Sequence, residues 1–132
     1  MYYGNSFNYG RIRTGRAVLV AISIPIFTSQ LEKSREATDL ANLRAAYAEA
    51  SAEALTADTA QYTAVTQKVE MKQTKAGWVT ANPEVAGVKF TNESQPFVAG
   101  TPVYVTVFCD GSNPTFSITE PTATTTKKLY TK

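Results

Sequence analysis

The sequence predicts an α+β fold in which a long N-terminal α-helix packs on a small antiparallel β-sheet. Three observations predict it. The 132 residues are enough for one modest hydrophobic core. Apolar side chains recur every three or four positions in the second half of residues 17–56, as they do in an amphipathic helix. After Thr56 the period falls to about two, which is typical of strands with one buried face.

The second half of the expected helix carries the face that packs on the sheet. Apart from Pro25, residues 17–56 contain no proline or glycine, and alanine, leucine, glutamate, arginine and lysine dominate beyond Phe27. These residue types favour helices. The apolar stripe consists of Leu40, Leu43, Tyr47, Ala50 and Ala54. Because the opposite side is polar, we expect this stripe to contact the core.

An apolar run, AVLVAISIPIF, forms residues 17–27. A helix of this length extends about 16 Å, roughly half of a bilayer's hydrocarbon core of about 30 Å. The run alone therefore does not span a membrane. Pro25 interrupts it, and we expect a bend in a continuous helix. The alternative is a helix that restarts with Ser29 and Glu32 as a capping box.

The expected helix is too long for the domain. Forty residues, 17–56, reach about 60 Å, whereas a compact domain of this chain length is about 35–40 Å across. We therefore expect about half of the helix, including the apolar run, to protrude. An exposed apolar helix needs lipid or other protein chains as a partner.

The remaining chain, residues 57–132, predicts the sheet. Strands are expected at residues 65–72, around Val88 and Phe90, at 103–109 and at 115–119. Asp110-Gly111 begins the turn between the last two. The final dozen residues lack periodicity and are expected to form a flexible tail. Residues 1–16 are polar and glycine-rich, and we expect them to be disordered.

Composition argues against an enzyme. The chain has no histidine, which removes the commonest general base and transition-metal ligand. Cys109 is the only cysteine and is expected to be a small buried residue. The net charge of +2 comes from basic and acidic residues spread along the chain, so we expect no specific nucleic-acid binding. No cofactor or metal site is predicted.

Two further patterns leave alternatives open. The aromatic residues Trp78, Tyr62, Tyr104 and Phe108 either complete a small core or form an aromatic binding patch. Asn92-Glu93-Ser94 matches a glycosylation sequon, which is a weak signal on its own.

Residues 17–50 resemble the N-terminal helix of type IV pilins, particularly those of Gram-positive bacteria. The shared features are the apolar run, a proline in an IPIF segment and the amphipathic helix that follows. The resemblance implies a structural subunit of a cell-surface filament that joins copies of itself through this helix. It also implies a membrane location before assembly, and contact with the pilus assembly machinery. The assembly residues it implies are Val18, Leu19, Val20, Ile22, Ile24, Pro25, Ile26 and Phe27.

The resemblance also gives a role to a charged cluster. Glu32, Lys33, Arg35 and Glu36 are candidates for ion pairs between neighbouring subunits. The alternative is a solvated helix face in which Arg35 and Asp39 contribute a few tenths of a kcal/mol. Two other functions remain open, namely a minor pilin or pseudopilin of the same machinery, and a soluble secreted binding module.

The chain departs from the family pattern at its N-terminus. Residues 3–8, YGNSFN, stand where the leader-peptidase motif and its glutamate are expected. Three arginines in GRIRTGR, residues 10–16, would cost about 2.5–3.5 kcal/mol each inside a bilayer. We hypothesise that residues 1–16 do not descend from the functional N-terminus, for example because of a frameshift. A leader and a full apolar run in another upstream reading frame would support this.

Overall fold

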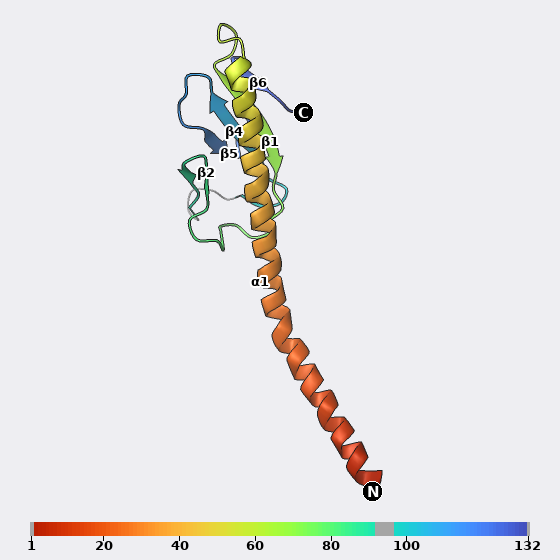
Figure 1. The fold of residues 1–132 in the computed structure, drawn as a ribbon. Helices are drawn as coiled ribbons and strands as arrows, with labels where there is room; N and C mark the ends of the chain where they lie inside the picture. Colours follow the sequence, from red (N-terminus) through yellow and green to blue (C-terminus); the bar gives the residue numbers. More distant parts are fainter. Residues whose placement is uncertain (1, 92–96, 132) are drawn as a thin grey trace. The chain divides into compact units, whose positions relative to one another are not determined.

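The structure is a computed structural model that describes the backbone of residues 2–91 and 97–131 and the side chains of residues 27–91 and 97–131. It is an α+β fold, with one long helix packed on a small mixed sheet (Figure 1). The elements are α1 (Tyr2–Thr56), β1 (Ala64–Glu70), β2 (Glu84–Val85), β3 (Val88–Lys89), β4 (Pro102–Phe108), β5 (Thr115–Ser117) and β6 (Thr126–Lys128). The chain divides into two compact units, residues 1–31 and 32–132, and the sheet belongs to the second.

Four strands form the main sheet in the order β5-β4-β1-β6. The pairs β1–β4 and β4–β5 are antiparallel, whereas β1–β6 is parallel. The prediction of an antiparallel sheet is therefore wrong for β6. This strand has only three residues, too few for an alternating pattern to reveal it. The expected hairpin of 103–109 and 115–119 is confirmed as β4 and β5.

The C-terminal segment packs on the sheet, which corrects the prediction of a flexible tail. Lys127, in β6, forms an ion pair with Glu53 of α1. The ring of Tyr130 lies 5.6 Å from that of Tyr104, centroid to centroid. Its hydroxyl donates a hydrogen bond to Glu120 at 3.1 Å. These contacts join positions distant in sequence, so local periodicity carries no sign of them.

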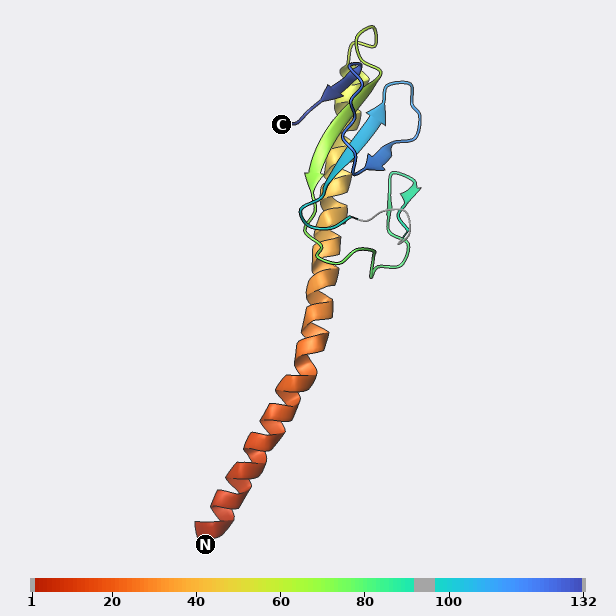
Figure 2. The same ribbon diagram turned by 180° about the vertical axis from the view of Figure 1, so that it is seen from behind.

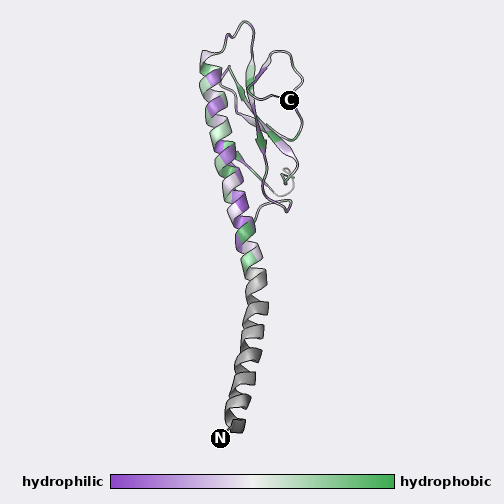
Figure 3. Ribbon diagram, turned by 90° about the vertical axis from the view of Figure 1, so that its right-hand side faces the viewer, coloured by the Kyte–Doolittle hydropathy of each residue, from purple (hydrophilic) through white to green (hydrophobic). Residues whose placement is uncertain are grey.

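Residues 32–56 of α1 lie across one face of the sheet (Figures 1 and 2). Apolar and polar residues share this part of the helix (Figure 3). Leu40 and Leu43 enter the same buried cluster as Val103 and Val105 of β4. Burial of one such leucine contributes about 1.5–3 kcal/mol. The aromatic members of this cluster are Trp78, Phe90, Phe97 and Phe116.

The helix begins earlier than the sequence predicts. It starts at Tyr2 rather than near residue 17, so residues 2–16 are helical where disorder was expected. The segment has three glycines but no proline, and an interior glycine weakens a helix by about 1 kcal/mol without ending it. The helix continues through Pro25, so it does not restart at Ser29. The bend at Pro25 stays a prediction.

A two-residue turn joins β2 to β3. Ala86 has φ 52° and Gly87 has φ 80°, and Val85 pairs with Val88 across them. Positive φ at both central positions defines a type I′ turn, whose twist suits a hairpin. Glycine adopts this conformation freely, but an alanine side chain is strained in it.

Candidate functional site

The apolar face implied for assembly is described only at its end. Phe27 is 72% exposed, and Leu31, four residues later on the same helix face, is 42% exposed. The other predicted assembly residues lie outside the described side chains, namely Val18, Leu19, Val20, Ile22, Ile24, Pro25 and Ile26. Within the described part of the chain, no helix carries an apolar stretch of the length that a bilayer crossing requires.

Next along α1 comes a row of three buried carboxylates. Glu32, Glu36 and Asp39 are 4%, 1% and 0% exposed. Their spacing of four and three residues places them on one helix face, which continues into the buried Leu40 and Leu43. The buried face of the helix is therefore acidic from Glu32 to Asp39 and apolar from Leu40 onward.

Each carboxylate accepts backbone hydrogen bonds from the segment 72–80. Asp39 accepts from the N–H groups of Lys72 and Gln73 at 2.8 Å each. Glu32 accepts from the N–H groups of Thr74 and Lys75 at 2.6 and 2.9 Å. We call these two side chains, together with Glu36, the acidic row.

Glu36 completes the acidic row at the far end of the segment. It accepts from the backbone N–H groups of Val79 and Thr80 at 2.6 and 3.0 Å, and from the Thr80 hydroxyl at 3.0 Å. Buried polar groups are costly unless they are hydrogen-bonded, and each partner here satisfies the other. The row thus fixes a segment without regular structure onto the helix.

The acidic row also positions Trp78. This residue lies between the anchored segments 72–75 and 79–80, and its ring stacks on Phe90 at 5.6 Å between centroids. Phe97 meets the Trp78 ring edge-on at 6.3 Å. Such aromatic contacts contribute about 0.5–1.5 kcal/mol beyond area burial. Trp78 is therefore part of the core rather than of a binding patch.

Hydrogen bonding and burial shift the pKa values of two members. Burial raises the pKa of the Glu32 carboxyl, but hydrogen bonds from Lys75, Thr74 and Arg35 outweigh it and lower this pKa from 4.5 to about 2. Burial raises the pKa of the Asp39 carboxyl, and the N–H groups of Gln73 and Lys72 oppose that rise. Glu32 is thus ionised at neutral pH.

The acidic row revises the predicted inter-subunit charges. Glu32 and Glu36 are buried and bonded within their own chain, so they are not surface charges. Arg35 donates to Glu32 at 3.1 Å and to the Thr74 hydroxyl at 3.3 Å. Lys33 is exposed. The sequence did not predict the buried role because the partners lie 33–44 residues away along the chain.

The predicted helix-to-sheet stripe is brought together in the structure. Leu40, Leu43 and Ala50 are buried, and Tyr47 and Ala54 are partly buried against the two apolar clusters. Sequence reasoning missed a further buried helix residue, Ala46, which is 4% exposed. Its position three residues after Leu43 and four before Ala50 was the signal.

The other candidate aromatic residues separate. Tyr62 and Phe108 line an open cavity of about 350 Å³ with Cys109, whereas Tyr104 packs on Tyr130. Cys109 is partly exposed rather than buried. Among the described residues, no group of three or more His, Cys, Asp or Glu side chains is arranged to hold a metal ion. The sequon at residues 92–94 lies outside the described residues.

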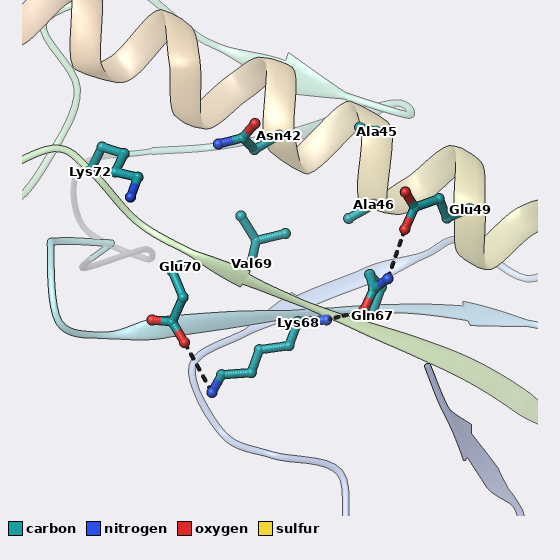
Figure 4. A pocket seen from close by; sticks show the side chains of 9 residues that line it. All are labelled: Asn42, Ala45, Ala46, Glu49, Gln67, Lys68, Val69, Glu70 and Lys72. Atoms are coloured by element: carbon teal, nitrogen blue, oxygen red, sulfur yellow. Dashed lines mark hydrogen bonds and ion pairs between the residues drawn. The ribbon is translucent and has the colours of Figure 1, made fainter. Parts of the chain in front are cut away.

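A groove of about 390 Å³ runs between α1 and β1 (Figure 4). Its walls include Asn42, Ala46 and Glu49 of the helix, and Gln67 and Glu70 of the strand. The Gln67 amide donates to Glu49 at 2.7 Å, and its carbonyl accepts from the Lys68 backbone N–H at 3.0 Å.

These features define a small α+β protein in which an acidic helix face anchors a loop and the helix packs on a mixed sheet. No protein-family model, curated protein or solved structure matches the chain.

Proposed function

We propose that this chain is a structural subunit of a type IV pilus-like surface filament, and that copies join through the apolar part of α1. One observation carries the proposal. Phe27 and Leu31 leave apolar surface open on the helix, and the sequence that leads to them is the apolar run of residues 17–27. Large exposed apolar surfaces mark contacts with protein or lipid.

The packing of residues 32–56 also supports the proposal, because this part of α1 makes its contacts within its own chain. The buried face of this segment is occupied in two parts: the acidic row binds residues 72–80, and the apolar stripe packs on the sheet. Residues 32–56 therefore serve the fold of the chain itself, and the apolar residues before them are left for assembly. The resemblance of residues 17–50 to pilin helices is the second support.

A minor subunit of the same machinery would share all of these features and differ in abundance. A soluble binding module would instead leave Phe27 and Leu31 without a partner. Assembly in solution separates this last possibility from a filament subunit.

The test compares two substitutions on one helix. Phe27 is 72% exposed and Leu55 is 88% exposed, so a charge at either position leaves the described core intact. Full-length chain is dispersed in detergent, the detergent is removed, and the material is sedimented and imaged by negative-stain electron microscopy. We expect filaments or large assemblies from wild type and Leu55→Glu, and their loss in Phe27→Glu. Dispersed wild-type chain, or equal assembly of both variants, would refute the proposal.

A further inference from the structure

The open cavity beside Tyr62 lies where β1 begins and β4 ends. Its volume of about 350 Å³ is lined by Thr59, Tyr62, Thr63, Phe108, Cys109 and Asp110. Small-molecule sites in proteins have volumes of about 300–1,000 Å³. None of these six residues belongs to the acidic row or to the two apolar clusters. The cavity is therefore separate from the contacts that hold the helix on the sheet.

Backbone hydrogen bonds fix both walls of the cavity. The N–H of Tyr62 donates to the Asp58 carbonyl at 2.8 Å, which turns the chain between α1 and β1. The N–H of Cys109 donates to the Thr63 carbonyl at 3.0 Å, which joins the end of β4 to this turn. The cavity thus exists before a ligand enters it, and a preformed site reduces the ordering cost of binding.

Two aromatic rings give the cavity its apolar surface. Tyr62 and Phe108 are each partly buried, so part of each side chain remains open to solvent. The Nζ atom of Lys127 lies 5.7 Å from the centroid of the Tyr62 ring, and the charge of this lysine is balanced by its ion pair with Glu53. Aromatic rings attract cations through their faces. The rings therefore suit a ligand that is apolar, cationic or both.

Asp110 supplies the charge of the cavity and is the one ionisable carboxylate among the six lining residues. Its Oδ1 atom accepts from the Ser112 hydroxyl at 2.6 Å and from the Ser112 N–H at 2.9 Å. These bonds lower the pKa of the Asp110 carboxyl, so the group is negative at neutral pH. An ionised carboxylate has about four acceptor positions, and Ser112 uses two of them.

From this combination of rings and charge we propose that the cavity binds a small organic cation, namely a protonated amine on an apolar body about the size of one aromatic ring. The body packs against Tyr62 and Phe108, and the ammonium group pairs with Asp110. Because this carboxylate is exposed, the ion pair contributes little, and the affinity is expected to be millimolar. The proposal does not depend on filament assembly.

The test uses three probes of similar size and different charge, phenethylamine, phenethyl alcohol and phenylpropionate. Cys109 lines the cavity and is the only cysteine of the chain, so its thiol reports occupancy. Full-length protein in a non-ionic detergent reacts with a neutral pyridyl disulfide, and absorbance gives the rate. We expect saturable slowing that is strongest with the amine and weakest with the anion. Glutathione in place of the protein should react at one rate with all three probes.

Two variants separate the charge from the rings. Asp110→Asn keeps an oxygen acceptor for Ser112 but removes the charge. It should weaken amine binding by up to about fivefold and leave alcohol binding unchanged. Phe108→Leu should weaken the binding of both probes about two- to fivefold. Glu84→Gln removes an exposed carboxylate that does not line the cavity, and it should bind as wild type does.

Three results would overturn the proposal. These are an unchanged Cys109 rate at tens of millimolar amine, equal protection by amine and alcohol in the wild type, or amine binding that Asp110→Asn leaves unaltered. An NMR titration gives a second measurement, in which the amine should shift the amides of Thr63 and Cys109. Shifts confined to residues outside the cavity would also contradict it. Thermal unfolding checks that each variant is folded, and Asp110→Asn alone decides if Phe108→Leu is not.

Discussion

Asp39 accepts a hydrogen bond from the backbone N–H of Gln73 at 2.8 Å, and both residues are completely buried. This bond joins a helix carboxylate to a segment 34 residues further along the chain. It belongs to the acidic row, through which Glu32, Glu36 and Asp39 hold residues 72–80 on α1. The row supplies to this segment the hydrogen bonds that a strand or helix supplies elsewhere.

Asp39→Asn should destabilise the fold by about 1.5–3 kcal/mol. The carboxylate accepts hydrogen bonds through both of its oxygens, whereas an amide has only one oxygen acceptor and leaves a buried backbone N–H without a partner. The free energy of unfolding in urea checks this. Glu84→Gln removes an exposed carboxylate and should change stability by less than about 0.5 kcal/mol. Equal effects of the two substitutions would contradict the role of the acidic row.

The Glu32 carboxylate makes the free energy of unfolding depend on pH. Its pKa is about 2 in the folded chain against an ordinary 4.5, so the folded state favours the ionised form. That stabilisation is complete above pH 4.5 and is lost as the pH falls towards 2. Urea unfolding of wild type and Glu32→Gln at several pH values should show a stability difference that shrinks across this window. A difference independent of pH would count against it.

Leu43 is fully buried on α1, whereas Leu55 on the same helix is 88% exposed. Leu43→Ala should therefore cost about 2–5 kcal/mol through lost burial and the cavity that remains. Leu55→Ala should stay within about 0.5 kcal/mol. Thermal and urea unfolding measure both. Similar losses at the two positions would show that the helix does not pack on the sheet through the Leu43 face.

The β2–β3 turn carries avoidable strain. Ala86 has φ 52°, a region where asparagine is far more comfortable than alanine. Ala86→Asn should stabilise the chain by about 0.5–1 kcal/mol. Ala81→Asn, at an exposed loop position, is the control and should produce no such gain. Differential scanning calorimetry distinguishes them, and a lower melting temperature for Ala86→Asn would argue against the type I′ turn.

The sequence was most informative where a pattern is local. The amphipathic stripe around Leu43 and the hairpin of β4 and β5 repeat with the period of their own element, so periodicity predicts them. The acidic row was not recognised, because Glu32 and Glu36 look like a solvated face until their N–H partners are known. Their position on the same stripe as Leu40 was the available signal. β6 was missed because its pairing with β1 depends on tertiary contacts such as Lys127 with Glu53.

The most direct test of the proposed filament is electron microscopy of cells that produce this chain, labelled with antibody against residues 60–132. We expect the antibody to decorate thin surface fibres along their length. Fibres should disappear when Phe27→Glu replaces the wild-type chain and persist with Leu55→Glu. Unlabelled fibres, or a chain recovered only as free monomer beside unaffected fibres, would contradict the assembly of copies through the apolar part of α1.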